Sequence, residues 1–382
     1  MLLPNRRSTH RRTQEWRFYG RMCMANAIYL VVDENLSDIA GLQAERVARQ
    51  WECDVHIFVE RRDLSAEVRQ FQADGRIFYH FEELGRFLPA GLPEDNKWPK
   101  IVYLRIFAPQ VLSGYKRLLY IDADVLSMWA NPVIWELSLP SGLGAVCDLA
   151  TLKRPPADEK RLTREEWLSD IGVKSGRYFN SGVLLIDPQK WLTIDFTKKL
   201  AEYFRLHPNA VRFDQDFLAH VFDGTWTELS PRFNYQAHTL ECGMTEAVNP
   251  VFIHFSRTYK PWYGRSTGWS APTDPRFYDL YREMIIEAGL RPESYHRPAR
   301  VNMIRQAKYA LRAWLTQMGI KSRRETREIE LWKKRGDQFR EFMDAGLSSG
   351  RFSDETRTKL SAEQYPPVFD GRFAVGSDNR PR

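Results

Sequence analysis

Short apolar runs separated by helical segments are the feature of this chain that most restricts its fold. They have the length and composition of strands buried on both faces of a sheet. The predicted strands are 27–32, 55–60, 76–81, 118–121, 144–147 and 183–186. The predicted helices of this part are 39–51, 66–72 and 100–112. This alternation is typical of βαβ units and predicts an α/β fold with a largely parallel sheet.

The strand at 118–121 ends in two carboxylates, Asp122 and Asp124, which one small residue separates. In an extended backbone their side chains share a face. Two hard oxygen ligands at the edge of an α/β sheet suit Mg²⁺ or Mn²⁺ carrying a diphosphate. Such a triplet is also common as a merely polar strand end, so by itself it leaves both interpretations open.

Four further motifs follow the sequence YIDADV in a fixed order. They are FNSGVLLIDPQKW (179–191), FDQDFLAHVF (213–222), RFNY (232–235) and IHFSRTYKPW (253–262). Together the five motifs resemble glycosyltransferase family 8, the nucleotide-sugar transferases that include bacterial lipopolysaccharide galactosyltransferases and glycogenin. The resemblance covers residues 27–262. It implies a single GT-A-type nucleotide-diphosphosugar transferase domain, in which helices flank a Rossmann-like mixed sheet.

The resemblance also implies a metal site. By the family pattern Asp122 and Asp124 are metal ligands, and His254 completes the set; mixed nitrogen and oxygen ligation is consistent with Mn²⁺, with Mg²⁺ as the alternative. Lys260 would reach the diphosphate as a point charge. Arg257 stands where the family has glycine, and it either displaces this loop or adds a second cation to the diphosphate, which we favour.

For the nucleotide, the resemblance assigns Val31, Asp33 and Asn35 to the base and ribose, at the end of the first strand, where open α/β sheets bind ligands. Leu36 replaces the family's usual tyrosine, so stacking on uracil would be weaker or come from another residue. Asp33 and Asn35 are also good helix N-caps, and the two roles can coexist.

For the donor sugar, the family's contacts match five positions that suit hydroxyl recognition. They are Arg105, Asp148, Asn180, Asp214 and Gln215. Family membership implies retention of the anomeric configuration. Because an amide is a poor nucleophile, we favour a same-face substitution in which the leaving phosphate helps to deprotonate the acceptor and Gln215 stabilises the oxocarbenium-like state. Asp214 or Asp148 as a transient nucleophile stays open, and Asp216 is assigned a structural role.

Composition places the chain among ordinary globular proteins, with 43% hydrophobic and 27% charged residues. Its four cysteines include no Cys-x-x-Cys pair, which fits a reducing cytoplasm. No apolar run reaches membrane-spanning length. The basic segment before residue 25 lacks the apolar core of an export signal. We expect a flexible tail there, and a start at Met22 or Met24 and a genuine disordered arm both stay open.

The expected organisation is a basic tail at 1–24, the catalytic domain at 25–265, a helical basic extension at 266–345 and a disordered tail at 346–382. An amphipathic helix at 301–319, followed by basic residues to 335, has two interpretations. It either docks on the catalytic domain or lies on an anionic membrane surface, which would place the protein in the cytoplasm or at the inner face of the cytoplasmic membrane. No nucleic-acid-binding fold accompanies the charge, so we expect no nucleic acid.

The leading hypothesis is a hexosyltransferase that moves galactose or glucose from a UDP-sugar to a glycan or glycolipid acceptor, in lipopolysaccharide or another cell-surface polysaccharide. The alternative is a catalytically silent sugar-nucleotide-binding or scaffold protein with the same fold, for which Arg257 and Leu36 are the warning signs. A nucleotidyltransferase would use a similar sheet and metal, but the NSG and KPW motifs do not belong to one.

Overall fold

The computed structural model describes residues 25–60, 68–94, 99–156, 162–240, 244–256, 260–264, 275–295 and, with short interruptions, 303–357. The described residues up to Leu229 form one compact unit, and those from Ser230 form a second. The predicted domain boundaries stay a prediction. Arg257, the predicted tail at 1–24 and residues 358–382 of the predicted disordered tail at 346–382 lie outside the described residues. The first part of that tail is described: α12 continues to Ser348, and Phe352 and Asp354 are buried.

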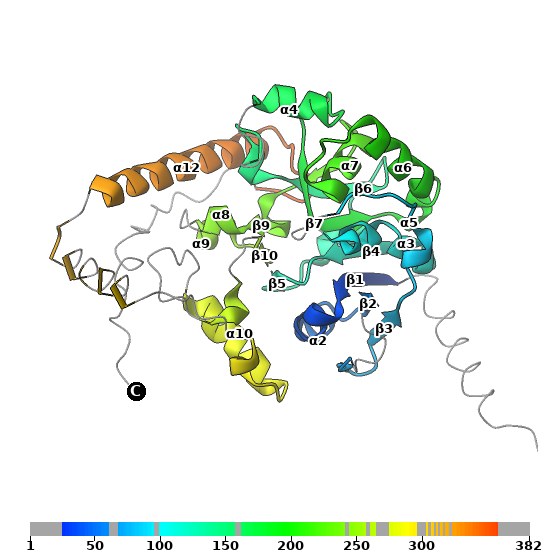
Figure 1. Ribbon diagram of the computed structural model, residues 1–382, viewed down its shortest axis with the longest axis horizontal. Coiled ribbons are helices and arrows are strands. Elements are labelled where there is room, and N and C mark those ends of the chain that lie inside the picture. Colours follow the sequence, from blue (N-terminus) through cyan, green and yellow to red (C-terminus); the bar gives the residue numbers. More distant parts are fainter. Residues whose placement is uncertain are drawn as a thin grey trace, which may run out of the picture. The chain divides into compact units, whose positions relative to one another are not determined.

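The first unit is built on one seven-stranded sheet in the order β3-β2-β1-β4-β7-β6-β8 (Figure 1). β7 is antiparallel to its neighbours β4 and β6, and the other pairings are parallel. The predicted parallel-rich α/β fold is confirmed. The strands are β1 (Asn26–Asp33), β2 (Asp54–Glu60), β3 (Ile77–Phe81), β4 (Arg117–Ile121), β6 (Leu143–Cys147), β7 (Phe179–Ile186) and β8 (Thr227–Leu229), and a short β5 (Val125–Ser127) follows β4.

The order of the strands creates a switch point between β1 and β4. From β1 the chain winds outward to β2 and β3, then crosses back to place β4 on the other side of β1. Ligands of open α/β sheets bind beyond the carboxyl ends of strands at such a point. Asp33 ends β1, and Asp122 follows β4 directly, so both lie at this edge.

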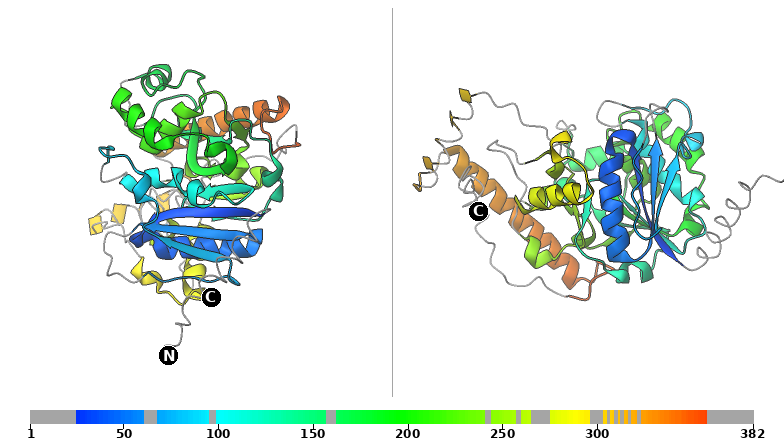
Figure 2. Two further views of the ribbon diagram at one scale, coloured as in Figure 1. Left: turned by 90° about the vertical axis from the view of Figure 1, so that its right-hand side faces the viewer. Right: turned by 90° about the horizontal axis from the view of Figure 1, so that it is seen from below.

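Helices cover the sheet, and one of them, α2, matches the helix predicted at 39–51. α2 lies along one face of β1 and β2 (Figure 2), and α7 packs against β7. The helices of this unit are α2 (Ser37–Trp51), α3 (Ala108–Val111), α4 (Arg164–Asp170), α5 (Pro188–Trp191), α6 (Phe196–Leu206) and α7 (Phe213–Val221). The 3₁₀ helices are η1 (Glu34–Leu36), η2 (Gly85–Phe87), η3 (Lys100–Ile106), η4 (Pro132–Glu136) and η5 (Leu149–Thr151).

Two predicted helices differ in the structure. Residues 68–72 are not helical, and the rest of the predicted helix at 66–72 lies outside the described residues. The predicted helix at 100–112 is broken into η3 and α3. Pro109 lies in the first turn of α3 and has no N–H to donate to the carbonyl of Arg105 four residues earlier, so one continuous α-helix does not span both segments. The hydroxyl of Tyr29 donates to that carbonyl instead, at 2.9 Å.

The second unit holds a short parallel pair of strands and a long helix. β9 pairs with β10 so that Ile253 lies opposite Tyr235 and His254 opposite Gln236. Phe339, Met343 and Leu347 are buried in the last half of α12. No described helix is long and apolar enough to cross a membrane. The elements are η6 (Pro231–Phe233), β9 (Tyr235–Gln236), α8 (Ala237–Leu240), α9 (Thr245–Val248), β10 (Phe252–His254), η7 (Pro261–Tyr263), α10 (Pro275–Glu287), η8 (Pro292–Ser294) and α12 (Arg323–Ser348).

Candidate active site

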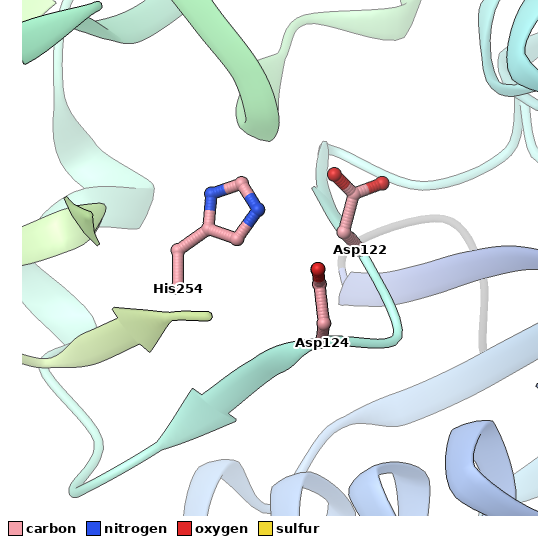
Figure 3. A group of neighbouring side chains, drawn as sticks. All are labelled: Asp122, Asp124 and His254. Carbon is pink, nitrogen blue, oxygen red and sulfur yellow. The ribbon is translucent and has the colours of Figure 1, made fainter. Parts of the chain in front are cut away.

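Asp122, Asp124 and His254 form the one group of three or more potential metal ligands found among the described residues. One ligand atom from each lies within 4.8 Å of the others (Figure 3). The two aspartates lie on the turn between β4 and β5, and the histidine ends β10. Two carboxylate oxygens and one imidazole nitrogen are a donor set that Mn²⁺ accepts.

The imidazole of His254 is oriented for such a role. It is buried, and its Nδ1 lies 3.0 Å from Oδ1 of Asn234. Because an amide oxygen only accepts, Nδ1 carries the proton in this contact, and Nε2 then presents a lone pair. Metal-binding histidines are commonly fixed by a hydrogen bond of this kind. The three side chains therefore fit a divalent cation in both donor type and tautomer.

The carboxylate of Asp122 is held by two side chains of the same unit. Tyr120, two residues earlier on the same face of β4, donates its hydroxyl to Oδ1. Nη1 of Arg105 lies 2.9 Å from the same oxygen. The guanidinium of Arg105 also stacks over the ring of Tyr120, at 4.7 Å from its centroid. Asp122 is thus oriented by a positive charge and by a hydroxyl.

Arg105 links Asp122 to a second carboxylate, that of Asp214 on α7. Nε of Arg105 lies 3.4 Å from Oδ2 of Asp214. The hydroxyl of Ser181 donates to the same oxygen at 3.2 Å. Burial raises the pKa of Asp214 to about 6, the charge of Arg105 opposes this, and the nearby charge of Asp122 adds to it. Asp214 is therefore a carboxylate whose charge depends on Arg105.

The amide of Gln215 is held at both ends by protein groups. Its Oε1 accepts from the backbone N–H of Ser181 at 3.1 Å and from Nδ2 of Asn180 at 3.3 Å. Its Nε2 donates to Oδ2 of Asp148 at 3.1 Å and to the hydroxyl of Tyr178 at 2.9 Å. These contacts leave one orientation of the amide, with oxygen toward β7 and nitrogen toward Asp148.

Asp148 and Asp216 complete this network. Asp148 caps η5 through the N–H groups of Ala150 and Thr151. Its other oxygen, besides accepting from Gln215, lies 3.4 Å from Nη1 of Arg212. Asp216 accepts from the Tyr178 hydroxyl at 2.5 Å and from the Arg212 N–H at 2.9 Å. The structural role predicted for Asp216 is consistent with these contacts, since it holds Tyr178 against Gln215.

The backbone that introduces Asp214 and Gln215 is strained. Phe213, the first residue of α7, has a φ of 34°, in the region that favours glycine. Its ring is buried and packs near Tyr103 and Phe204, with centroids 6.0 and 6.2 Å away. Strained residues persist where surrounding packing determines them, and they cluster at functional sites. The strained residue stands directly before Asp214 and Gln215 at the start of α7.

The predicted nucleotide residues lie together at the end of β1. Asp33 caps η1 by accepting from the N–H groups of Asn35 and Leu36, at 3.0 and 3.1 Å. Val31 is buried and Asn35 is exposed. The capping role of Asp33 is thus present, and it leaves the side chain of Asn35 at the surface beside the switch point.

Lys260 is the described member of the predicted phosphate-binding pair. Its Nζ donates to the carbonyl of Phe255 at 2.8 Å, which closes the loop that follows β10. Arg257 lies outside the described residues, so its role stays a prediction.

Several residues of the network were not predicted from the sequence. Each of them lies within or next to a motif that was recognised in the sequence. Tyr120 precedes the aspartates, Tyr178 precedes FNSG, and Arg212 precedes FDQD. Ser181 and Asn234 lie inside NSG and RFNY. Tyr120 had a usable signal, because period-two alternation places it on the face of Asp122. The others are identified only by their contacts.

The sequence profile described as "Glycosyl transferase family 8" matches residues 43–265, which is more than half of the chain. The chain belongs to glycosyltransferase family 8. This agrees with the resemblance carried by the five motifs, and the motifs from YIDADV to KPW all fall within the matched residues.

Curated relatives of this family 8 chain are 27–29% identical to it over about half of its length. It is 29% identical over 188 residues to General stress protein A of Bacillus subtilis, covering 44% of this chain and 61% of that protein. It is 28% identical over 204 residues to Lipopolysaccharide 1,2-glucosyltransferase of Escherichia coli, covering 50% and 56%. Lipopolysaccharide 1,3-galactosyltransferase of Salmonella typhimurium is 27% identical over 183 residues, covering 45% and 52%. The chain spans about half the length of such relatives.

Solved structures agree with the family 8 fold. Galactosyltransferase LgtC, in complex with donor and acceptor sugar analogs, matches with a TM-score of 0.54 at 24% identity, covering 67% of this chain and 95% of LgtC. The bifunctional glycosyltransferase WbbM matches with a TM-score of 0.53 at 17% identity, covering 68% and 49%. At these identities the likeness shows the GT-A-type fold.

Proposed function

We propose that this protein is a metal-dependent, retaining glycosyltransferase that moves galactose or glucose from a UDP-sugar to a glycan acceptor. Family membership supports the reaction class. The observation that carries the proposal is the group of Asp122, Asp124 and His254 beside the polar network of Arg105 and Asp214 at the switch point. Because relatives include lipopolysaccharide glucosyl- and galactosyltransferases, the proposed acceptor belongs to lipopolysaccharide or another cell-surface polysaccharide.

In this proposal Asp122, Asp124 and His254 hold Mn²⁺ or Mg²⁺. A bound divalent cation neutralises the charge that grows on the departing β-phosphate. Val31, Asp33 and Asn35 bind the nucleoside at the end of β1, and Lys260 and Arg257 face the diphosphate. The donor in this arrangement is a UDP-hexose.

The polar network binds the donor sugar and stabilises the developing positive charge. Gln215 is the residue that faces the anomeric carbon, and an amide whose oxygen already accepts two protein hydrogen bonds is a poor nucleophile. Asp214 is shared by Arg105 and Ser181, and Asp148 by Gln215, Arg212 and two backbone N–H groups. Because hydrogen bonds and ion pairs within the protein already occupy both carboxylates, we favour the same-face substitution over a covalent intermediate on Asp214 or Asp148.

We also propose that residues 301–335 bind an anionic membrane surface at the cytoplasmic side. Met303 is 84% exposed, Ile304 70% and Trp314 55%. Exposed basic side chains accompany them at Lys308 and Arg327. An exposed apolar stripe with basic neighbours is typical of helices that lie in a membrane interface, and it suits a glycolipid acceptor.

The first experiment is a donor screen. Full-length protein is incubated with MnCl₂ and a panel of UDP-sugars, and released UDP is measured. We expect release from UDP-galactose or UDP-glucose that EDTA abolishes, and NMR of the product should show retained anomeric configuration. Binding of UDP-sugars without release from any donor, with or without acceptor glycans, would favour the silent binding protein.

Asp122→Ala and Asp124→Ala should each abolish release, because each removes a proposed metal ligand. Asp124→Ala should leave the melting temperature near that of the wild type, whereas Asp122→Ala should lower it, because the buried Arg105 loses a carboxylate partner. Glu136→Gln is the matched control, since its carboxylate is 72% exposed and pairs with Lys116. Full activity in either aspartate variant would contradict the metal assignment.

A further inference from the structure

The chain after α12 returns to the segment that precedes β9. Oδ1 of Asp354 accepts from the N–H of Ser230 at 2.6 Å, and Oδ2 accepts from the Ser230 hydroxyl at 2.6 Å. Glu355 lies between two guanidinium groups, 3.1 Å from Nη1 of Arg232 and 2.9 Å from Nε of Arg357. The contact joins residues 124 positions apart. We call Asp354, Glu355 and Arg357 the C-terminal clasp.

The two carboxylates of the clasp are buried, whereas the Arg357 side chain is 34% exposed. The buried carboxylates distinguish the clasp from an ordinary surface ion pair. Ser230 has no exposed surface, Asp354 is buried, and the Glu355 side chain is 2% exposed. Burial raises the pKa of Asp354. Burial also acts on Glu355, but hydrogen bonds and charge from Arg357 and Arg232 outweigh it and lower its pKa. Removing one member of a buried, paired set is strongly destabilising to the local arrangement.

From the clasp, short contacts lead to His254. Ser230 and Arg232 flank Pro231 at the start of η6, and the N–H of Asn234 closes that turn on the Pro231 carbonyl at 3.2 Å. Asn234 is the residue that holds Nδ1 of His254.

A second set of hydrogen bonds connects the clasp to β10, and it runs through Arg232. Its carbonyl accepts from the N–H of Val251 at 2.8 Å, one residue before β10, and its Nε donates to the carbonyl of Asn249. The guanidinium of Arg357 reaches the carbonyl of Ala247 at 3.3 Å, just before that segment. Both the partner of His254 and the strand that carries it are therefore tied to the clasp.

We propose that Asp354 and Glu355 are positioning residues for the metal site: through Ser230, Arg232 and Asn234 they set the orientation of His254. The proposal rests on the proposed role of His254 as a metal ligand. The clasp lies beyond residue 265, where the family profile ends, so in this chain residues outside the matched region support the site. Loss of the clasp should raise the Kd for Mn²⁺ at temperatures where the protein is still folded.

The test measures Mn²⁺ affinity directly, by the EPR signal of free Mn²⁺ in titrations of full-length protein with MnCl₂ in the presence of excess UDP. The variants are Asp354→Asn, which keeps the side-chain size, Glu355→Gln and Asp354→Ala. Glu246→Gln is the matched control, because it breaks an exposed ion pair with Arg276 in the same unit. We expect the Kd for Mn²⁺ to rise about tenfold in Asp354→Ala and less in Asp354→Asn, with no change in the control.

A double-mutant cycle separates positioning from stability, since residues that act through one another are not additive. In a His254→Ala background the clasp substitutions should change the Kd for Mn²⁺ no further. Thermal melts ensure that each titration is done well below unfolding. A clasp variant that lowers the melting temperature but binds Mn²⁺ like the wild type, or that weakens binding equally with and without His254, would overturn the proposal.

Asp124→Ala serves as the reference for the proposed function. If it abolishes Mn²⁺ binding while the clasp variants bind normally, only the positioning proposal fails. If Asp124→Ala binds Mn²⁺ like the wild type, the metal site itself is wrong and both proposals fall.

Discussion

At the scale of single residues, the amide of Gln215 shows how a side chain without charge can occupy the centre of a charged site. Its oxygen and its nitrogen are each held by two protein groups, so its dipole has one direction. A fixed dipole costs no reorganisation when charge develops beside it, which is the main source of electrostatic catalysis. Tyr178 and Asp216 are part of that fixation.

We predict that Gln215→Ala lowers turnover by a factor of about 10²–10³, in the range seen when one preorganised polar group is removed, and changes UDP affinity little. The reason is that Gln215 contacts Asp148 and β7 and is assigned to the sugar, not to the diphosphate. Steady-state kinetics and calorimetric titration with UDP measure the two effects. A loss confined to UDP affinity would show that Gln215 lies elsewhere relative to the donor.

A pH prediction follows from Asp216, which accepts hydrogen bonds from Tyr178 and Arg212. Burial raises its pKa to about 6 from an ordinary value of 3.8. Between these values the folded state binds the proton more tightly than the unfolded state. The stability contributed by this group therefore falls as pH rises through that window. Asp216→Asn removes the titration.

Between pH 5 and pH 7 we expect the wild type to lose about 1 kcal/mol more free energy of unfolding than Asp216→Asn does. Urea denaturation of both proteins at the two pH values gives the difference, and a constant offset from the lost carboxylate contact cancels in it. Parallel pH profiles would mean that Asp216 does not titrate in this range.

At the scale of elements, the break between η3 and α3 is what aims Arg105 at the site. Pro109 ends the possibility of a continuous helix, and the Arg105 carbonyl that it leaves without a helical donor is bonded to Tyr29 in the centre of β1. The same residue then directs its guanidinium toward Asp122 and Asp214. Pro109 and the buried hydroxyl of Tyr29 thus fix the backbone of Arg105. Its guanidinium then lies between the carboxylates of Asp122 and Asp214.

We predict that Tyr29→Phe lowers the free energy of unfolding by about 1–3 kcal/mol, since a buried carbonyl loses its donor, and lowers transfer activity because Arg105 loses its anchor. Urea denaturation and UDP-release kinetics measure the two effects. An unchanged stability would indicate that the Arg105 carbonyl finds another donor.

At the scale of the whole molecule, the chain beyond the family profile contains two kinds of segment. The last half of α12 buries Phe339, Met343 and Leu347 and leads to the clasp. The part before it exposes a run of apolar side chains. They are Met303, Ile304, Leu311, Trp314, Met318 and Ile320. A truncation at residue 298 would remove both, so substitutions separate them better than deletion.

We predict that replacing Leu311, Trp314 and Met318 by glutamine abolishes co-sedimentation with anionic vesicles and leaves hydrolysis of the UDP-sugar in solution intact. Binding by the wild type should weaken with salt, because each basic residue near the surface contributes about 1 kcal/mol that ions screen. Leu206→Gln is the control, since that leucine is also exposed, at 54%, in α6. If the segment docks on the protein instead, the triple variant would melt earlier, and the wild type would never sediment with vesicles.

Six of the seven strands of the main sheet and the position of the paired aspartates could be predicted from the sequence, because both depend on local patterns. The order of the strands within the sheet was not predicted. The end of the apolar run at 118–121 placed Asp122 and Asp124 directly after β4. The structure puts the two aspartates on a turn and not on the extended backbone that the sequence predicted. The five motifs predicted the family. At 100–112 the apolar spacing favours a helix, whereas Pro109 disfavours a continuous one. The predicted helix was therefore wrong in extent, because the structure divides it into η3 and α3.

Only the tertiary structure decided which distant residues meet. Nothing local in RFNY indicates that Asn234 orients His254, and nothing in the C-terminal segment indicates that Asp354 holds Ser230, 124 positions away. Such contacts depend on how packed elements bring buried polar groups together, and each group needs a partner only once burial has removed its water. The sequence by itself therefore determined the fold class and the types of residue at the site, whereas packing determined their partners, protonation and direction.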